Sequence, residues 1–374
     1  MMGIYLDHAA TTRMRDEVIE EMMPYFQTHY GNAASSYGLG VESRRALNHA
    51  RTSIADTLQA KPEEIYFTSG GTEADNWAIR GITEACKEKG KHIITSKIEH
   101  PAVLQTCRFL ESQGYEITYL NVDSSGSVDV KELESAIRKD TILISIMYAN
   151  NEVGTIQPVQ QISEIAHARG VLFHTDAVQA YGQIPVSAKR DGFDMLSASA
   201  HKFNGPKGVG FLYVRGYQKI DSFIRGGEQE VGKRAGTENV PGIVGMAKAA
   251  ELAQQEMPER MQRTQRLRNL LWSRISEEIP KVTSNTSAKD ILPGILNVSF
   301  GGRESAQMLG HLDRKEIYAS GGSACSSQDR KPSHVLLAMG KTPEEIRGAV
   351  RFSLGYDNTE EEIELVMDVL TKMR

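Results

Sequence analysis

A regular alternation of short apolar runs and amphipathic segments dominates the chain between residues 65 and 214. The apolar runs have the length and the β-branched content of strands, and segments with helical spacing lie between most of them. Such alternation is typical of a mostly parallel sheet with helices on its faces, and ligands of these sheets bind at the carboxyl ends of the strands. The pattern predicts an α/β fold, with strands at residues 65–68, 92–95, 116–120, 142–147, 171–174 and 209–214.

The pattern changes after about residue 245. An amphipathic helical region runs from Ile243 to about Ile279, and we expect an interruption near Pro258, because proline lacks the backbone N–H that a helix interior needs. A strand-like run at residues 295–300 and further helices follow. The chain is therefore expected to form a large domain and a smaller α+β domain, comprising residues 15–245 and residues 1–14 with 246–374 respectively.

Composition excludes several classes of function. The net charge of the 374 residues is −5, which does not resemble a nucleic-acid-binding surface, and no apolar run approaches the roughly 20 residues of a membrane span. No basic stretch followed by an apolar one marks a signal peptide at the start. The cysteines Cys86, Cys107 and Cys325 are far apart, so neither a disulfide framework nor a metal site is expected. A reducing, cytoplasmic location follows as the expectation.

Lys202 follows directly after an apolar run that ends in small residues, and glycines and a proline come after it. A lysine held at a strand end can form a Schiff base with an aldehyde cofactor. Taken alone, Lys202 would be interpreted as one more exposed surface lysine, since most lysines are exposed.

Two other strand ends carry groups that would suit the same cofactor. In the segment from Ser69 to Asp75, glycines including Gly71 let backbone N–H groups approach an anion at a helix N-terminus, and Thr72 adds a hydroxyl. Asp176 could hold a pyridine nitrogen protonated, which makes the ring an electron sink. Read singly, Thr72 and Asp176 could each be no more than a helix cap.

Two further strand ends carry polar side chains. Asn151 could donate or accept hydrogen bonds with a cofactor oxygen or a substrate carboxylate, or could belong to an Asn-rich turn. His100 could stack on an aromatic cofactor or move protons, or could be a capping, partly buried histidine.

The C-terminal part adds a thiol and a guanidinium. Cys325 lies in a small, polar segment with Arg330 and Lys331 close by, as a reactive thiolate requires, whereas Cys86 and Cys107 fit buried structural positions. Arg351 lies between apolar residues of a short strand and could clamp a carboxylate, although it could also be an ordinary ion-paired arginine. Together with the strand-end groups, these residues make up the parts of one cofactor site and one nucleophile.

The complete set resembles the NifS/IscS-type cysteine desulfurases, class V enzymes of the aspartate aminotransferase fold type I. The resemblance extends over nearly the whole chain, and joint occurrence of its motifs in this order is highly specific. The motifs are Tyr5-Leu-Asp-His-Ala-Ala-Thr-Thr12, Ser69-Gly-Gly-Thr-Glu73, Asn150-Asn-Glu152, Ala200-His-Lys202, Arg234-Ala-Gly-Thr-Glu-Asn239, Gly322-Ser-Ala-Cys325 and Arg351-Phe-Ser-Leu-Gly355. It implies a seven-stranded, mostly parallel sheet in the large domain.

The resemblance also implies roles for individual residues. Pyridoxal 5′-phosphate would be bound to Lys202, with His100 stacked on its ring and Asp176 on its nitrogen. Further cofactor contacts would come from Gly71, Thr72, Asn151, Gln179, Ser199 and His201, and from Thr237 of a second subunit, which implies a homodimer. The carboxylate of L-cysteine would be held by Arg351, Asn151 and Asn32. Cys325 would take the sulfur and pass it to an acceptor protein of Fe–S assembly, tRNA thiolation or cofactor biosynthesis.

Two departures and three alternatives accompany this interpretation. The residue before the His-Lys pair is Ala200, where the family often has glycine or another small residue. Where the family often has a proline, the segment Gly31-Asn-Ala-Ala-Ser35 has alanine, which could loosen the loop around Asn32. A selenocysteine lyase or a class V aminotransferase would share most of the motifs, but an aminotransferase would not need Cys325. A sulfur-relay scaffold without turnover would not need Lys202 and Asp176 together.

Overall fold

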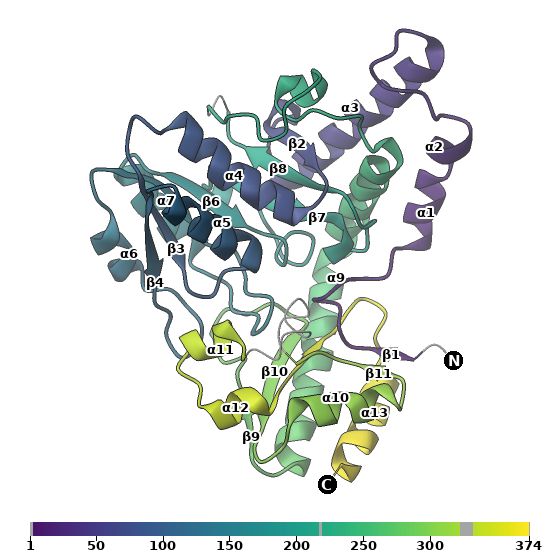
Figure 1. The fold of residues 1–374 in the computed structure, drawn as a ribbon. Coiled ribbons are helices and arrows are strands. Elements are labelled where there is room, and N and C mark those ends of the chain that lie inside the picture. Colours follow the sequence, from purple (N-terminus) through teal and green to yellow (C-terminus); the bar gives the residue numbers. More distant parts are fainter. Residues whose placement is uncertain (1–2, 217–218, 322–331, 374) are drawn as a thin grey trace.

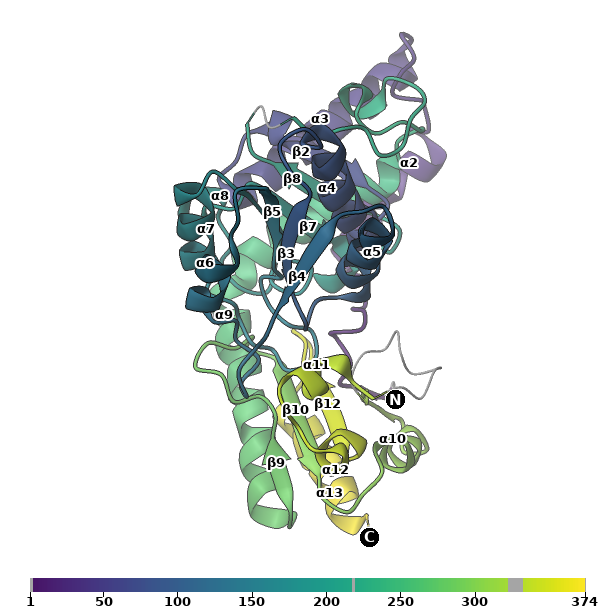
Figure 2. The ribbon, with the colours of Figure 1, turned by 60° about the vertical axis from the view of Figure 1, so that its left-hand side comes forward.

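The computed structural model describes residues 3–216, 219–321 and 332–373, and the chain forms two units of unequal size (Figure 1). The larger unit contains the central sheet, and the smaller one contains both ends of the described chain. Figure 2 shows the two units one above the other, with helix α9, Val240–Glu278, running through both. None of the helices in the described ranges combines the length and apolar character that a membrane span requires.

The sheet of the larger unit has seven strands within the described residues, in the order β2-β8-β7-β6-β5-β3-β4. Only β8 runs antiparallel to its neighbours β2 and β7, so the predicted α/β class and the mostly parallel sheet are confirmed. The strands are β2 Ile65–Thr68, β3 His92–Ser96, β4 Glu116–Leu120, β5 Thr141–Ser145, β6 Leu172–Asp176, β7 Met195–Ser199 and β8 Gly210–Val214.

Two hydrophobic cores lie on opposite faces of this sheet. Successive side chains of a strand point to opposite faces, and accordingly Ile93 belongs to one core and Ile94 to the other. Helices α4 (Gly71–Ala85) and α5 (Pro101–Ser112) cover the first face. The second core includes residues of α3, α6, α7, α8 and α9, where α3 is Gly38–Leu58, α6 Val130–Ala136, α7 Val159–Ala168 and α8 Ala188–Asp191. Short 3-10 turns lie at Pro62–Glu64, Ala200–Lys202 and Gln229–Gly232.

The smaller unit has its own core around an antiparallel sheet in the order β12-β10-β9. Its strands are β9 Val282–Ser284, β10 Ile295–Phe300 and β12 Ala349–Ser353. A second, two-stranded sheet pairs β1 (Ile4–Tyr5) with β11 (Ile317–Tyr318), and Leu6 is fully buried in the same core. The N-terminal arm is therefore part of this unit. Its helices are α10 Ser305–Asp313, α11 His334–Ala338, α12 Pro343–Arg347 and α13 Glu360–Lys372.

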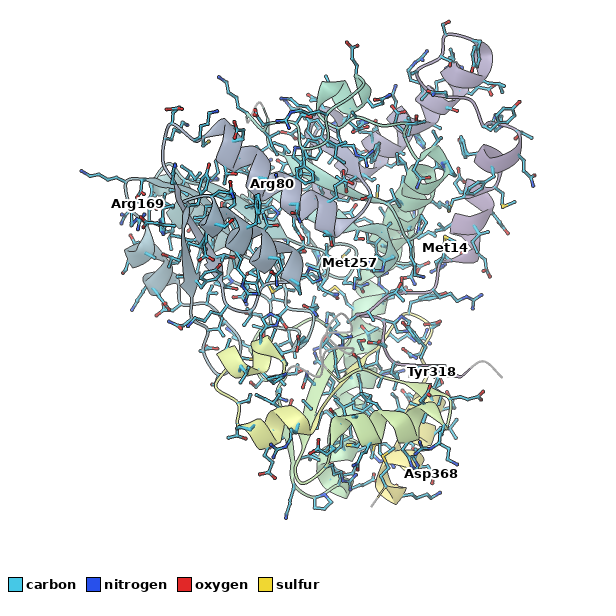
Figure 3. The ribbon with its side chains drawn as sticks, viewed as in Figure 1. Met14, Arg80, Arg169, Met257, Tyr318 and Asp368 are labelled. Carbon is cyan, nitrogen blue, oxygen red and sulfur yellow. The ribbon has the colours of Figure 1, made fainter. Side chains whose placement is uncertain are left out.

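The expected interruption near Pro258 is wrong, because α9 continues through it as one helix of 39 residues. The buried side chain of Arg260 donates hydrogen bonds to the carbonyls of Ala253 in α9 and of Gly182 in the larger unit, which fixes this part of the helix against that unit. Met257, directly before the proline, is buried where the two units meet (Figure 3). Packing on both sides of Pro258 thus holds the helix together.

The division at residues 245 and 246 falls inside α9 and stays a prediction. Ala247, Ala250 and Ala253 pack in the larger core, whereas Leu267 and Leu271 pack in the smaller one. The packing favours a boundary near Pro258.

Two short helices follow the N-terminal arm, α1 (Asp16–Met22) and α2 (Pro24–Gln27). Val18 and Met22 are buried against the larger core. Other apolar side chains of these helices are exposed, by 39% for Ile19 and 58% for Phe26. An apolar surface of this kind is typical of a protein–protein contact.

Candidate active site

A cavity of about 490 Å³ opens at the carboxyl ends of the parallel strands, in the size range of small-molecule sites. Residues from five strand ends meet in it with the N-terminal arm and with β12 of the smaller unit. Ten of the residues expected from the sequence line this cavity: Gly71, Thr72, His100, Asn151, Asp176, Gln179, Ser199, His201, Lys202 and Arg351.

The end of the cavity beside β2 is suited to an anion. Helix α4 begins at Gly71, and the first N–H groups of a helix have no acceptor within it. A Cβ added at Gly71 would lie 2.6 Å from Cγ2 of Val178, so only glycine fits there without a shift. Ser199, at the end of β7, lies opposite Gly70 and Gly71. Burial lowers the pKa of His201 to about 4, so this ring is neutral and can donate or accept a hydrogen bond.

Lys202 lies in a short 3-10 turn directly after β7. Its Nζ donates hydrogen bonds to the backbone carbonyls of Ala9 and Ala10, at 2.6 and 2.9 Å. The side chain of Gln179 donates to the same Ala9 carbonyl at 2.9 Å. Backbone carbonyls of the N-terminal arm thus orient the amine.

Asp176 ends β6 and is buried, with one carboxylate oxygen accepting the backbone N–H of Val178 at 2.9 Å. Burial raises the pKa of Asp176, while the neighbouring His100 and Lys202 act in the opposite direction. His100 caps α5, since its Nδ1 accepts the N–H of Ala102. Burial lowers the pKa of His100, so its ring is mainly neutral near pH 7.

A layer of polar side chains behind Asp176 was not expected from the sequence. Asp75 on α4 and His174 on β6 are buried, with 3.6 Å between Asp75 Oδ1 and His174 Nε2. Glu99 is also fully buried, and it accepts hydrogen bonds from Ser96 Oγ and from the backbone N–H of Met147. The available signal for Asp75 was a carboxylate on an otherwise apolar helix face, next to Ala74 and Ala78.

Arg351 enters the cavity from β12 of the smaller unit, with only 1% of its side chain exposed. Nη2 donates to Asp7 Oδ1 at 2.7 Å, and Nη1 donates to the backbone carbonyl of Asn151 at 2.8 Å. The Nε atom is buried and has no hydrogen-bond partner among the described residues. The guanidinium is therefore held firmly, and its remaining N–H groups can donate to a ligand carboxylate.

Comparison with known proteins identifies the family. The profile "Aminotransferase class-V" matches residues 4–366. The chain is 52% identical to "Cysteine desulfurase IscS" of Methanosarcina thermophila, over 99% of this chain and 92% of that protein. The corresponding protein of Dictyoglomus turgidum is 51% identical over 99% and 94%. The chain belongs to the class-V aminotransferase family, in its group of IscS/NifS-type cysteine desulfurases.

Solved structures agree with this assignment. A "NIFS-LIKE PROTEIN" superimposes with a TM-score of 0.94 at 41% identity, and covers 99% of both chains. A structure titled "SspA in complex with cysteine" has a TM-score of 0.84 at 36% identity, and the match covers 95% of this chain and all of that one. The protein is thus a cysteine desulfurase, and enzymes of this family depend on pyridoxal 5′-phosphate.

The cavity fits this cofactor. Its volume is adequate, the glycine-lined start of α4 is suited to the phosphate, and Lys202 and Asp176 offer an amine and a carboxylate in the same space. Asp75, His100 and Asp176 also bring three potential metal ligands within 4.8 Å of one another, but these side chains belong to the cofactor cavity.

Two expected site residues lie outside this cavity, and a third is not among the described residues. Asn32 is exposed in the loop before α3, where its side chain accepts the N–H of Ala34, and it does not line the cavity. Thr237 is exposed as well, although the nearby Arg234 pairs with Glu73 on α4 at 2.8 Å. Cys325 lies outside the described residues.

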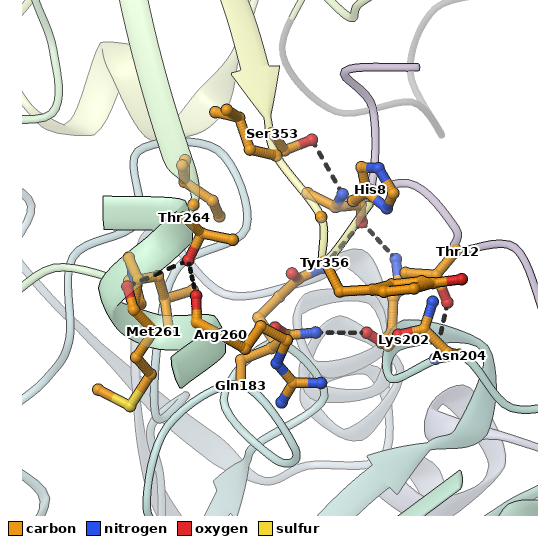
Figure 4. A pocket seen from close by; sticks show the side chains of 18 residues that line it. His8, Thr12, Gln183, Lys202, Asn204, Arg260, Met261, Thr264, Ser353 and Tyr356 are labelled. Atoms are coloured by element: carbon orange, nitrogen blue, oxygen red, sulfur yellow. Dashed lines mark hydrogen bonds between the residues drawn. The ribbon is translucent and has the colours of Figure 1, made fainter. Parts of the chain in front are cut away.

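A second cavity, of about 40 Å³, lies on the other side of the N-terminal arm (Figure 4). Lys202 and Gln179 border both cavities, and Gln183 donates to the Lys202 carbonyl at 2.8 Å from this side. His8 and Arg260 line it, and it is only large enough for a few water molecules.

Proposed function

We propose that Lys202 binds pyridoxal 5′-phosphate in the larger cavity, and that the enzyme converts L-cysteine to L-alanine while Cys325 takes the sulfur. The observation that carries this proposal is the convergence of Lys202, Asp176 and Arg351 on one cavity from two units of the fold. The structural relative in complex with cysteine supports the choice of amino acid.

The cofactor end of the cavity provides the chemistry at Cα. When bound, pyridoxal phosphate supplies an electron sink for the negative charge left at Cα of an amino acid. In our proposal, the amine of Lys202 accepts the proton from Cα, and the Asp176 carboxylate holds a positive charge on the ring nitrogen. His100 would contact the bound ring as a neutral imidazole. The backbone N–H groups of Gly71 and Thr72, with Ser199 and His201, hold the phosphate.

The other end binds the substrate. Arg351 donates to the substrate carboxylate through its remaining N–H groups. The neighbouring Asn151 side chain adds a hydrogen bond. Because Asp7 and the Asn151 carbonyl already fix the guanidinium plane, little side-chain entropy is lost on binding.

The sulfur step needs no external oxidant. The Cys325 thiolate attacks the substrate sulfur, an S–S bond forms as the C–S bond breaks, and the carbon product leaves as alanine after protonation. The persulfide then transfers its outer sulfur to an acceptor protein, for which Fe–S assembly, tRNA thiolation and cofactor biosynthesis are the candidates.

We also propose a homodimer in the cytoplasm. The exposed apolar side chains of α1 and α2 support a contact with a second copy, and such a contact would let Thr237 of that copy complete the phosphate site. Two free, buried thiols, Cys86 and Cys107, are compatible with a reducing compartment. Light scattering of the purified protein tests the dimer, and a monomeric mass at micromolar concentration would contradict it.

The reaction is tested by supplying L-cysteine to the purified protein and measuring alanine, sulfide and keto acids separately. Alanine should form in the wild type and fall strongly in Cys325→Ser, whereas Cys107→Ser should behave like the wild type. Keto-acid formation in place of alanine, or wild-type alanine formation by Cys325→Ser, would overturn the proposal.

A further inference from the structure

Two carboxyl groups meet in the wall of the cofactor cavity. Asp75 comes from α4 and Asp176 from the end of β6, and both belong to the group of polar atoms that lies within 4.8 Å. Asp75 is 1% exposed and Asp176 is 6% exposed. Two carboxylates this close, and this well shielded from water, cannot both be ionised near neutral pH, so the pair shares one proton.

The surroundings of the two groups are unequal. Asp176 accepts the N–H of Val178 and faces His100 and Lys202, which favour its negative form. Asp75 Oδ1 has no hydrogen-bond partner among the described residues. The negative charge of the pair is therefore better stabilised on Asp176.

The titratable groups that face Asp75 offer it no compensating charge. On β6, burial lowers the pKa of His174 to about 3, so this ring is neutral, and Nε2 also contacts Ser197 Oγ at 3.0 Å. Beyond β3, burial raises the pKa of Glu99 to about 8, so this carboxyl is mainly protonated at pH 7. Burial and the neighbouring Asp176 raise the pKa of Asp75, against a smaller opposite effect of a hydrogen bond from Ser197.

We propose that Asp75 is a positioning residue for Asp176. Asp75 keeps its own proton, and the single negative charge of the pair therefore lies on Asp176, which faces the cofactor. This inference rests on the proposed role of Asp176 at the ring nitrogen. Asp75 acts by fixing where the charge of the pair lies, and it does so without touching the substrate.

Infrared spectroscopy of the full-length enzyme tests the protonation state directly, with and without bound pyridoxal phosphate. Asp75→Asn should remove a protonated-carboxyl band at pH 7 and leave the ionised-carboxylate bands unchanged. Glu99→Gln serves as the matched control, and should remove a different protonated-carboxyl band. Loss of an ionised-carboxylate band in Asp75→Asn would overturn the proposal.

A second variant keeps the test independent of how well Asp75→Asn folds. In Asp176→Asn the charge beside Asp75 is gone, so the Asp75 band should disappear at a pH lower by roughly one unit or more than in the wild type. An unchanged midpoint would show that the two carboxyls do not share their charge, and would overturn the proposal. Neither readout depends on turnover, so failure of the alanine assay and failure of this inference are separable.

Discussion

The two ends of the cofactor cavity differ in the surroundings of their main charged group, Asp176 at one end and Arg351 at the other. In our proposal the single negative charge of the Asp75–Asp176 pair lies on Asp176, near the neutral ring of His174 and the mainly protonated carboxyl of Glu99. At the Arg351 end, one positive charge is already paired with Asp7 and with the Asn151 carbonyl.

This difference fits the different partners of the two ends. In our proposal a resident cofactor brings a positive charge to Asp176, in addition to the Lys202 amine that already favours its negative form. A substrate that arrives and leaves needs a guanidinium that is already in place, and Asp7 keeps Arg351 buried and oriented between turnovers. Substitutions at the two ends should therefore affect different quantities, the affinity for the cofactor at one end and the kinetics with the substrate at the other.

Lys202→Ala removes the group that lies between the two ends and should cause the largest loss. We expect alanine formation to fall by roughly 10³-fold or more, because the proton-transfer group and the cofactor attachment are lost together. The measurement is the rate of alanine release, with the exposed Lys189→Ala on α8 as control. Retention of more than a tenth of the activity would contradict the assignment.

Arg351→Met should affect only the substrate end. Loss of charged hydrogen bonds to the carboxylate should lower kcat/KM for L-cysteine by roughly 10²-fold, while the affinity for pyridoxal phosphate stays near the wild-type value. Steady-state kinetics and a cofactor titration check the two parts. Arg351→Lys should recover little activity, because lysine lacks the planar set of donors. If the affinity for pyridoxal phosphate fell as much as kcat/KM, the two ends of the cavity would not act separately, and the prediction would be wrong.

Gly71→Ala should weaken only the cofactor end, and by less. The added Cβ meets Val178 Cγ2 at 2.6 Å, so we expect the affinity for pyridoxal phosphate to fall roughly 10-fold. The double variant Gly71→Ala with Val178→Ala should regain most of the affinity, as measured by equilibrium dialysis. If the second substitution brings no recovery, crowding is not the reason that glycine is needed.

Glu99→Gln should change only the dependence of stability on pH. Burial raises the pKa of Glu99 to about 8, whereas an unfolded glutamate titrates near 4.3. Between these pH values the unfolded chain releases a proton that the folded chain keeps. Glu99 therefore lowers the free energy of unfolding of the wild type by about 1.4 kcal/mol for each unit by which the pH rises. The stability of Glu99→Gln relative to the wild type should therefore increase from about pH 5 to pH 8. Denaturant unfolding at several pH values checks this, and a pH-independent difference would contradict it.

Sequence patterns were sufficient for the sheet and for most of the cavity. Strand ends of parallel strands meet at one edge, so Thr72, His100 and Asp176 could be assigned to one site before their distances were known. The sequence pattern also identified the β10 run at residues 295–300.

Features that depend on tertiary contacts could not be predicted in the same way. Pro258 was interpreted by its local preference, but packing of α9 in both cores maintains the helix on either side of it. Asp75 and Glu99 looked like ordinary acids, because only the folded chain removes them from water. The role of Asp7 could not be predicted either, because its partner Arg351 lies on β12, 344 positions later in the chain.

The continuity of α9 has a consequence for how the molecule can be divided. One helix supplies side chains to both cores, so no flexible linker separates the two units along this part of the chain. A protease that needs an extended segment finds none between Val240 and Glu278, and a chain cut at residue 245 would leave a severed helix with exposed apolar faces at both ends. The two units therefore cannot be dissected into independently soluble fragments at this point, and they should melt as one cooperative body.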